Sequence, residues 1–203
     1  MSKSQGSQTN WLLRPTLMVV LLFLFNVTGC HKLPPTYNGI DITGAEAYRG
    51  FQLKDSQGKV RSLQDFSGKY VLIFFGFTQC PAICPTALAR AAAVKQQLGK
   101  DGDRLQVIFI SIDPERDTPE LMAAYTQNFD SSFIGLRGNA QETKITADEF
   151  KVYYAKVPTG SDYTMDHSTM SYLFDPKGRI RLALRHEHNA EQYVADIRQL
   201  MTE

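Results

Sequence analysis

The sequence predicts a single α/β domain with a central mixed β-sheet flanked by helices, and three observations support this prediction. The runs 70–77 and 104–112 are almost continuously apolar and rich in β-branched and aromatic residues, as is typical of parallel strands buried on both faces. Each run is followed by a stretch with helical periodicity. In the segment 168–185, apolar and polar residues alternate around a turn, which indicates an antiparallel strand pair.

Composition is that of one globular domain. The chain has 203 residues, of which 43% are hydrophobic, enough for a hydrophobic core. Its formal net charge of +1 gives no electrostatic reason to expect a nucleic-acid partner. We expect the folded domain to occupy residues 50–203 and to follow a tether over residues 30–49, which contains Pro34 and Pro35.

The first residues have the pattern of an export signal. Lys3 and Arg14 precede an apolar run over 17–25, which is shorter than the about 20 residues of a membrane span. The sequence Val-Thr-Gly-Cys that ends at Cys30 resembles a bacterial lipobox. We therefore expect residues 1–29 to be a lipoprotein signal peptide and Cys30 to carry lipid, which anchors the domain to a bacterial membrane on its periplasmic or extracytoplasmic side. An uncleaved anchor helix and a soluble secreted protein are the alternatives.

The elements follow in an order that specifies the fold. An N-terminal β-hairpin is expected over 51–63, around Ser56-Gln57-Gly58. A strand over 70–77 leads to a helix from Cys84 to Leu98, and a second strand over 104–112 leads to a helix with Thr118 as its N-cap.

A third helix over 139–154 leads into a short strand. The strands 168–174 and 179–185 form a hairpin, with Arg179, Arg181 and Arg185 on a face expected to be wet. Asn189 then caps a last helix. Parallel βαβ units followed by an antiparallel hairpin and a helix are the thioredoxin-like layout.

Two of the three cysteines lie where this fold places its active site, in the turn between the first long strand and its helix. Cys80 and Cys84 are separated by three residues, and a helix N-terminus favours thiolates. The pair is compatible with a redox disulfide, a structural disulfide or a metal site. Thiolates are soft ligands that suit Cu(I), zinc or iron–sulfur clusters, and two sulfurs need a further ligand.

His167 is the best candidate for that ligand, because it directly precedes the strand 168–174, whose entry faces the cysteine turn in thioredoxin-like folds. Thioredoxins have a cis-proline there, whereas the nearest upstream proline is Pro158. Asp166 is a candidate to orient His167, or a solvated turn residue. Met165 and Met170 are expected to pack in the core, and His186 and His188 to lie in a surface loop.

Three motifs, "FFGFTQCPAICPTAL", "SIDPERDTPE" and "DHSTMSYLFDPKG", together resemble the Sco/SenC family of copper chaperones over most of residues 50–185. The resemblance implies that Cys80, Cys84 and His167 bind one copper ion, as Cu(I) or Cu(II), for the dinuclear copper centre of cytochrome c oxidase subunit II. It also implies that Asp113 and Asp117 lie near the copper, although a strand end and a helix cap explain them equally well. Family members often carry an acid between the cysteines, where this chain has Ala82 and Ile83.

Two functions follow from these residues. The first is a copper chaperone without enzymatic turnover, whose partners are subunit II and a copper donor. It also needs a thioredoxin-like thiol reductant as a partner, because a disulfide cannot ligate copper as two thiolates. The alternative is an extracytoplasmic thiol–disulfide oxidoreductase that acts on cysteines of the oxidase subunit or of other exported proteins. Peroxidase chemistry is disfavoured, since no basic residue lies between Phe74 and Arg90 to assist a peroxidatic thiolate.

Overall fold

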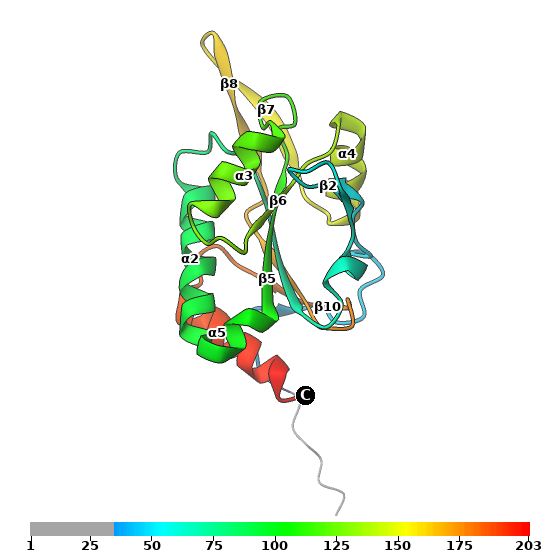
Figure 1. Ribbon diagram of the computed structural model, residues 1–203, viewed down its shortest axis with the longest axis vertical. Coiled ribbons are helices and arrows are strands. Elements are labelled where there is room, and N and C mark those ends of the chain that lie inside the picture. The colour runs from blue at the N-terminus through cyan, green and yellow to red at the C-terminus, as the bar shows by residue number, and fades with distance from the viewer. Residues whose placement is uncertain (1–34) are drawn as a thin grey trace, which may run out of the picture. The chain divides into compact units, whose positions relative to one another are not determined.

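Within residues 35–203, which the computed structural model describes, six strands form one mixed sheet in the order β1-β10-β9-β4-β5-β6 (Figure 1). The strands of this sheet are β1 (Ile40–Asp41), β4 (Tyr70–Gly76), β5 (Leu105–Ser111), β6 (Ile134–Leu136), β9 (Ser171–Phe174) and β10 (Ile180–Leu184). The helices are α2 (Ile83–Leu98), α3 (Pro119–Gln127), α4 (Ala140–Glu149) and α5 (Ala190–Met201), with short 3-10 helices at Leu63–Phe66 and Gly99–Arg104. The predicted mixed α/β fold is therefore confirmed.

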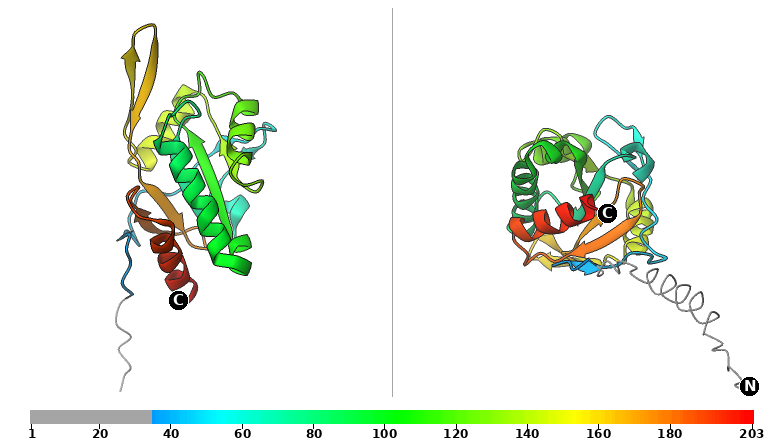
Figure 2. Two further views of the ribbon diagram at one scale, coloured as in Figure 1. Left: turned by 90° about the vertical axis from the view of Figure 1, so that its left-hand side faces the viewer. Right: turned by 90° about the horizontal axis from the view of Figure 1, so that it is seen from below.

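The two longest strands of this sheet form its centre. Every residue of β4 and β5 is buried, and the two strands pair in parallel with Ile73 opposite Ile108. Helices α2 and α5 pack side by side on one face of the sheet, while α4 lies on the other (Figures 1 and 2). Because both faces are covered, the central strands contain almost no polar residues, which is why the sequence signal was strong.

The predicted helix ends are also confirmed. Helix α2 ends at Leu98 as predicted, and its C-cap is Gly99, whose φ of +61° suits a glycine. The side chain of Thr118 accepts a hydrogen bond from the backbone N–H of Leu121 at the start of α3. Asn189 and Gln192 form a reciprocal capping box at the start of α5.

The expected N-terminal hairpin is present but short. It consists of β2 (Leu53–Lys54) and β3 (Val60–Arg61), which pair with each other, and Lys54 also forms an isolated antiparallel bridge with Arg137. Asp55 closes the turn, because its carbonyl accepts a hydrogen bond from the N–H of Gly58, which has a φ of +78°.

A second hairpin was not predicted. Strands β7 (Tyr154–Thr159) and β8 (Asp162–His167) form a separate two-stranded sheet that projects beyond the rest of the domain (Figures 1 and 2). The sequence predicted one short strand followed by a loop up to residue 167. His167 is instead the last residue of β8, and the next strand begins at Ser171 rather than Ser168.

Two further expectations need correction. Of the three arginines expected on a wet face, Arg179 and Arg185 are exposed, but Arg181, inside β10, is only 9% exposed and pairs with Glu203. Strand β1 pairs with β10 inside the range predicted as a tether, so the folded part begins before residue 50. The predicted signal peptide and Cys30 lie outside the described residues. In the described part of the chain, no helix is both long enough and apolar enough to span a membrane.

Candidate metal centre

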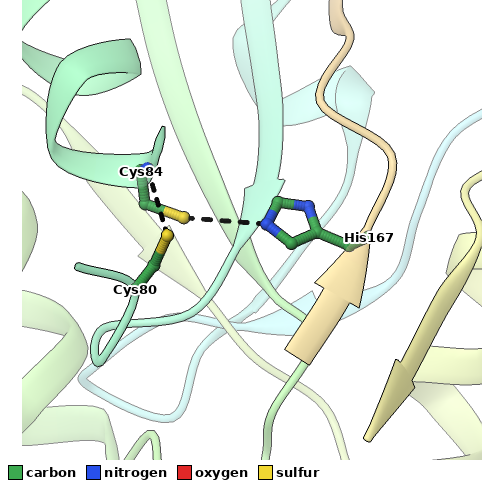
Figure 3. A group of neighbouring side chains, drawn as sticks. All are labelled: Cys80, Cys84 and His167. Carbon is green, nitrogen blue, oxygen red and sulfur yellow. Dashed lines mark hydrogen bonds between the residues drawn. The ribbon is translucent and has the colours of Figure 1, made fainter. Parts of the chain in front are cut away.

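The two cysteines lie at the carboxyl end of β4, where the chain turns into α2 (Figure 3). Cys84 is the second residue of α2, and its backbone N–H donates a hydrogen bond to Cys80 Sγ at 3.4 Å. The N-cap residue, Ala82, has no side chain that could accept such a bond. The sulfur of Cys80 therefore satisfies a free N–H at the positive end of the helix, which stabilises its thiolate.

His167 approaches the cysteines from the end of β8 (Figure 3). Its Nε2 atom lies 4.0 Å from Cys84 Sγ. Its Nδ1 atom lies 2.8 Å from the carbonyl oxygen of Ser168, and since a carbonyl only accepts, Nδ1 carries the proton and donates. Nε2 then has a free lone pair directed at the sulfurs, the arrangement usual for a metal-binding histidine.

Among the described residues, Cys80, Cys84 and His167 form a group whose ligand atoms all lie within 4.8 Å of one another. Sulfur and nitrogen ligands bind a metal at about 2.0–2.3 Å, so two ligands of one ion are at most about 4.6 Å apart. Small shifts would therefore let these atoms hold a single ion. No other group of this kind, with three such side chains, occurs within residues 35–203.

The three side chains differ in exposure. Cys84 is fully buried, whereas Cys80 and His167 are half-buried. The two half-buried residues border a cavity of about 230 Å³, whose other walls include Phe77 and Ile83. The site is thus enclosed on the side of Cys84 and open on the side of Cys80.

Gly76 makes room for the Cys84 sulfur, a role that sequence reasoning missed. A Cβ atom at this position would lie 2.5 Å from Cys84 Sγ and 2.7 Å from Phe109. The available signal was a glycine at the end of an otherwise bulky strand, where glycine often marks close approach by another group.

The pKa values of the two thiols are shifted in opposite directions. The pKa of Cys80 is lowered to about 3, chiefly by the hydrogen bond from the Cys84 thiol and also by hydrogen bonds from the backbone N–H groups of Cys84 and Ala82. The pKa of Cys84 is raised, because its thiol donates to Cys80 and because it is buried. At neutral pH the pair therefore consists of a Cys80 thiolate and a Cys84 thiol.

The carboxylates of the second motif lie beside the site but outside the ligand group. Asp117 accepts hydrogen bonds from Ser111 Oγ at 2.6 Å and from the N–H and Oγ1 of Thr78 at 3.1 and 2.6 Å. Burial raises the pKa of this carboxyl group. Thr78 is two residues before Cys80, so Asp117 supports the cysteine turn. Asp113 is also buried and accepts a hydrogen bond from Arg116 Nε at 2.5 Å.

The other candidates are placed as follows. The side chain of Asp166 is exposed, and the partner of His167 Nδ1 is the Ser168 carbonyl, so an influence of Asp166 on the metal stays a prediction. Met165 is 7% exposed and belongs to the core. His186 and His188 lie before α5 and outside the ligand group.

Comparison with known proteins identifies relatives over most of the described chain. The family model described as SCO1/SenC matches residues 41–202. A SCO2-like protein of Rickettsia felis is 42% identical over 132 residues, which are 64% of this chain and 64% of that protein. This chain therefore matches slightly less than two thirds of the length of that relative.

Solved structures agree with this match. ScoI of Bradyrhizobium japonicum with copper bound is 42% identical, with a TM-score of 0.68 over 74% of this chain and 96% of that one. BsSco is described as having a disulfide switch and as a member of the Sco family of cytochrome c oxidase assembly proteins. It is 25% identical, with a TM-score of 0.64 over 81% of this chain and 98% of that one. The sequence match and the shared thioredoxin-like fold show that this chain belongs to the SCO1/SenC family.

Proposed function

We propose that this protein binds one copper ion through Cys80, Cys84 and His167 and delivers it to the dinuclear copper site of cytochrome c oxidase subunit II. The observation that carries the proposal is the convergence of two sulfurs and one imidazole nitrogen within 4.8 Å. Soft thiolates with one imidazole suit Cu(I), and a relative with copper bound supports copper over zinc. The opening on the side of Cys80 suits an ion that is passed on rather than kept.

The copper site has a direct test. The fully reduced protein is loaded with Cu(I) without oxygen, and the bound copper per chain is measured for the wild type, His167→Ala and a control, His188→Ala. We expect one tightly bound ion per chain in the wild type and the control and weak or no binding in His167→Ala. Copper binding by His167→Ala as tight as that of the wild type would exclude the Cys₂His site.

Delivery is tested separately. The copper-loaded protein is mixed with the soluble copper domain of subunit II, and the copper content of the two proteins is measured after separation. Transfer should require reduced cysteines in both proteins, which a thioredoxin-like thiol reductant would supply in the cell. If copper stays on the donor under reducing conditions, the proposed direction of transfer is wrong.

We also propose that Cys30 carries lipid and holds the domain at the extracytoplasmic face of a bacterial membrane. The lipobox-like sequence before Cys30 supports this location. Radiolabelled palmitate should enter the wild-type protein and not the Cys30→Ser variant. Equal labelling of the two would exclude lipidation at this residue.

Thiol–disulfide exchange is a second candidate function, and the lowered pKa of Cys80 favours it. A thiolate is the reactive form of cysteine in exchange, and Cys80 has a partner thiol in Cys84. The relative described with a disulfide switch supports redox chemistry in this family. As an oxidoreductase, the protein should keep its rate of reducing a model disulfide in His167→Ala and lose it in Cys80→Ser.

A further inference from the structure

The hairpin of β7 and β8 carries one ligand of the proposed site, yet it is nearly detached from the core. Its strands pair only with each other, with no backbone ladder to the central sheet. Within the two strands, Met165 is the one buried residue. The cysteines, by contrast, follow a strand buried over its whole length. The distance from His167 to the cysteines therefore depends on the few side chains that attach the hairpin.

Tyr163, Met165 and His167 share the face of β8 that is turned toward the domain. Side chains alternate along a strand, and these three are less exposed than Asp162 and Asp166. A contact that fixes Tyr163 thus also fixes the orientation of His167, four residues further along the same strand.

Tyr163 is attached to the loop that follows β5. Its hydroxyl donates to Asp113 Oδ1 at 2.8 Å, and its carbonyl accepts from Arg116 Nη1 at 2.7 Å. The Arg116 guanidinium also lies 3.7 Å from the centre of the Tyr163 ring. The side chain of Asp113 is completely buried, and its other oxygen binds Arg116. Hydrogen bonds to a buried carboxylate are among the stronger ones in proteins.

The loop after β5 is also hydrogen-bonded to the turn that carries Cys80 and Cys84. Asp117, four residues after Asp113, binds Thr78 in the cysteine turn. The ring of Phe77 adds a further link, because it lies 6.0 Å from the His167 ring and 5.9 Å from the Arg116 guanidinium. One short loop is thus bonded to both parts of the site.

We propose that Tyr163 is a positioning residue for His167. Its bond to Asp113 fixes β8 to the loop that also fixes the cysteine turn, and this keeps His167 Nε2 within reach of Cys84 Sγ. The inference rests on the proposed copper site, since it concerns how one ligand of that site is held in place.

The test is a double-mutant cycle on the reduced full-length protein. Cu(I) affinity is measured by competition with a chromophoric chelator for the wild type, Tyr163→Phe, His167→Ala and the double variant. The phenylalanine keeps the ring and removes only the hydroxyl. We expect Tyr163→Phe to weaken copper binding about ten-fold and to have no further effect when His167 is already alanine. The control, Tyr153→Phe, alters a ring that is 61% exposed and should leave affinity unchanged.

Two other readouts separate positioning from general damage. Urea unfolding of the apo protein reports any global loss of stability, and the electron paramagnetic resonance spectrum of the Cu(II) form reports imidazole coordination through nitrogen hyperfine coupling. The nitrogen coupling should weaken or become heterogeneous in Tyr163→Phe and stay normal in Tyr153→Phe. An unchanged affinity in Tyr163→Phe, or an equal loss in the His167→Ala background, would overturn the inference. If His167→Ala itself binds copper normally, the proposed site and this inference fall together.

Discussion

Replacing Gly76 by alanine would place a methyl group against the sulfur of Cys84. The new Cβ atom would lie 2.5 Å from that sulfur and 2.7 Å from Phe109 Cε2. Non-bonded carbon atoms prefer separations of about 3.5–4.0 Å, so each neighbour must retreat by roughly 1 Å. The backbone has little freedom to move instead, because Gly76 pairs with Ser111 and its carbonyl accepts a hydrogen bond from Ile112.

Overpacking of this kind costs about 1–3 kcal/mol of the free energy of unfolding, and two simultaneous clashes favour the upper part of that range. The sulfur that is displaced is a proposed copper ligand, so copper affinity should fall at least about ten-fold. Urea unfolding of the apo protein measures the first effect, and chelator competition measures the second.

Gly135→Ala is the matched control, because Gly135 lies in β6 and its new methyl group would meet Met122 of α3 at 3.0–3.2 Å and not a cysteine. This control should lose stability and keep its copper affinity. In a Cys84→Ala background, the stability cost of Gly76→Ala should shrink, since one clash is gone. A Gly76→Ala variant with wild-type stability and wild-type copper affinity would refute the reasoning.

Three further predictions concern titration and capping. Cys80 should react with iodoacetamide at a nearly constant rate from pH 8 to about pH 5, because its pKa of about 3 keeps it a thiolate, whereas buried Cys84 should stay unmodified. Mass spectrometry of the alkylated peptides measures this, and a rate that falls ten-fold per pH unit would contradict it. Burial raises the folded-state pKa of Asp117, so its contribution to stability should decline as pH rises above about 4, where the unfolded chain loses this proton and the folded one keeps it. In urea titrations, the free energy of unfolding of the wild type should therefore approach that of Asp117→Asn as the pH rises. A difference that widens with pH would mean that the pKa of Asp117 is lowered in the folded state, contrary to this prediction. Asn189→Ala removes the N-cap of α5 and should cost about 1 kcal/mol in the same titrations with no change in copper affinity, so that weaker copper binding would count against a purely local role.

The sequence was informative where a residue's role depends on its immediate neighbours along the chain. The apolar run before Cys80 and the helical periodicity after Cys84 were enough to place both cysteines at a strand-to-helix turn, as the structure has them. Thr118 and Asn189 were assigned as helix caps because a cap bonds to the backbone N–H only a few residues further on. His167 was paired with the cysteines through the expected fold, and the structure brings the three together.

The β7/β8 hairpin was missed because its residues lack the usual signal. Strand β7 is mostly exposed and contains Pro158, so it has neither a buried apolar face nor the composition of a central strand. A hairpin held by Tyr163 and Arg116 depends on contacts 47 residues apart, which periodicity cannot reveal. The available clue was Gly160, whose φ of +67° closes the turn between the strands.

Arg181 illustrates the same limit. Its alternation with leucines correctly indicated a strand, but whether its face is wet depends on the other segments that cover it. The Arg181 guanidinium pairs with Glu203 and donates to Thr43 Oγ1, and both partners are distant in sequence. Burial of a charged side chain was therefore decided by tertiary packing and not by the local pattern.

The unequal burial of the two sulfurs would determine the order in which their bonds to a bound copper ion are replaced. Cys84 is enclosed, whereas Cys80 borders the open cavity. An incoming ligand from a second protein can reach a bound ion only from the open side, so it would replace the bond to Cys80 before the bond to Cys84. The inner bond would then break last, after the receiver has formed its own. Such an order would keep the metal attached to at least one protein at every moment of the exchange, and no free ion would escape.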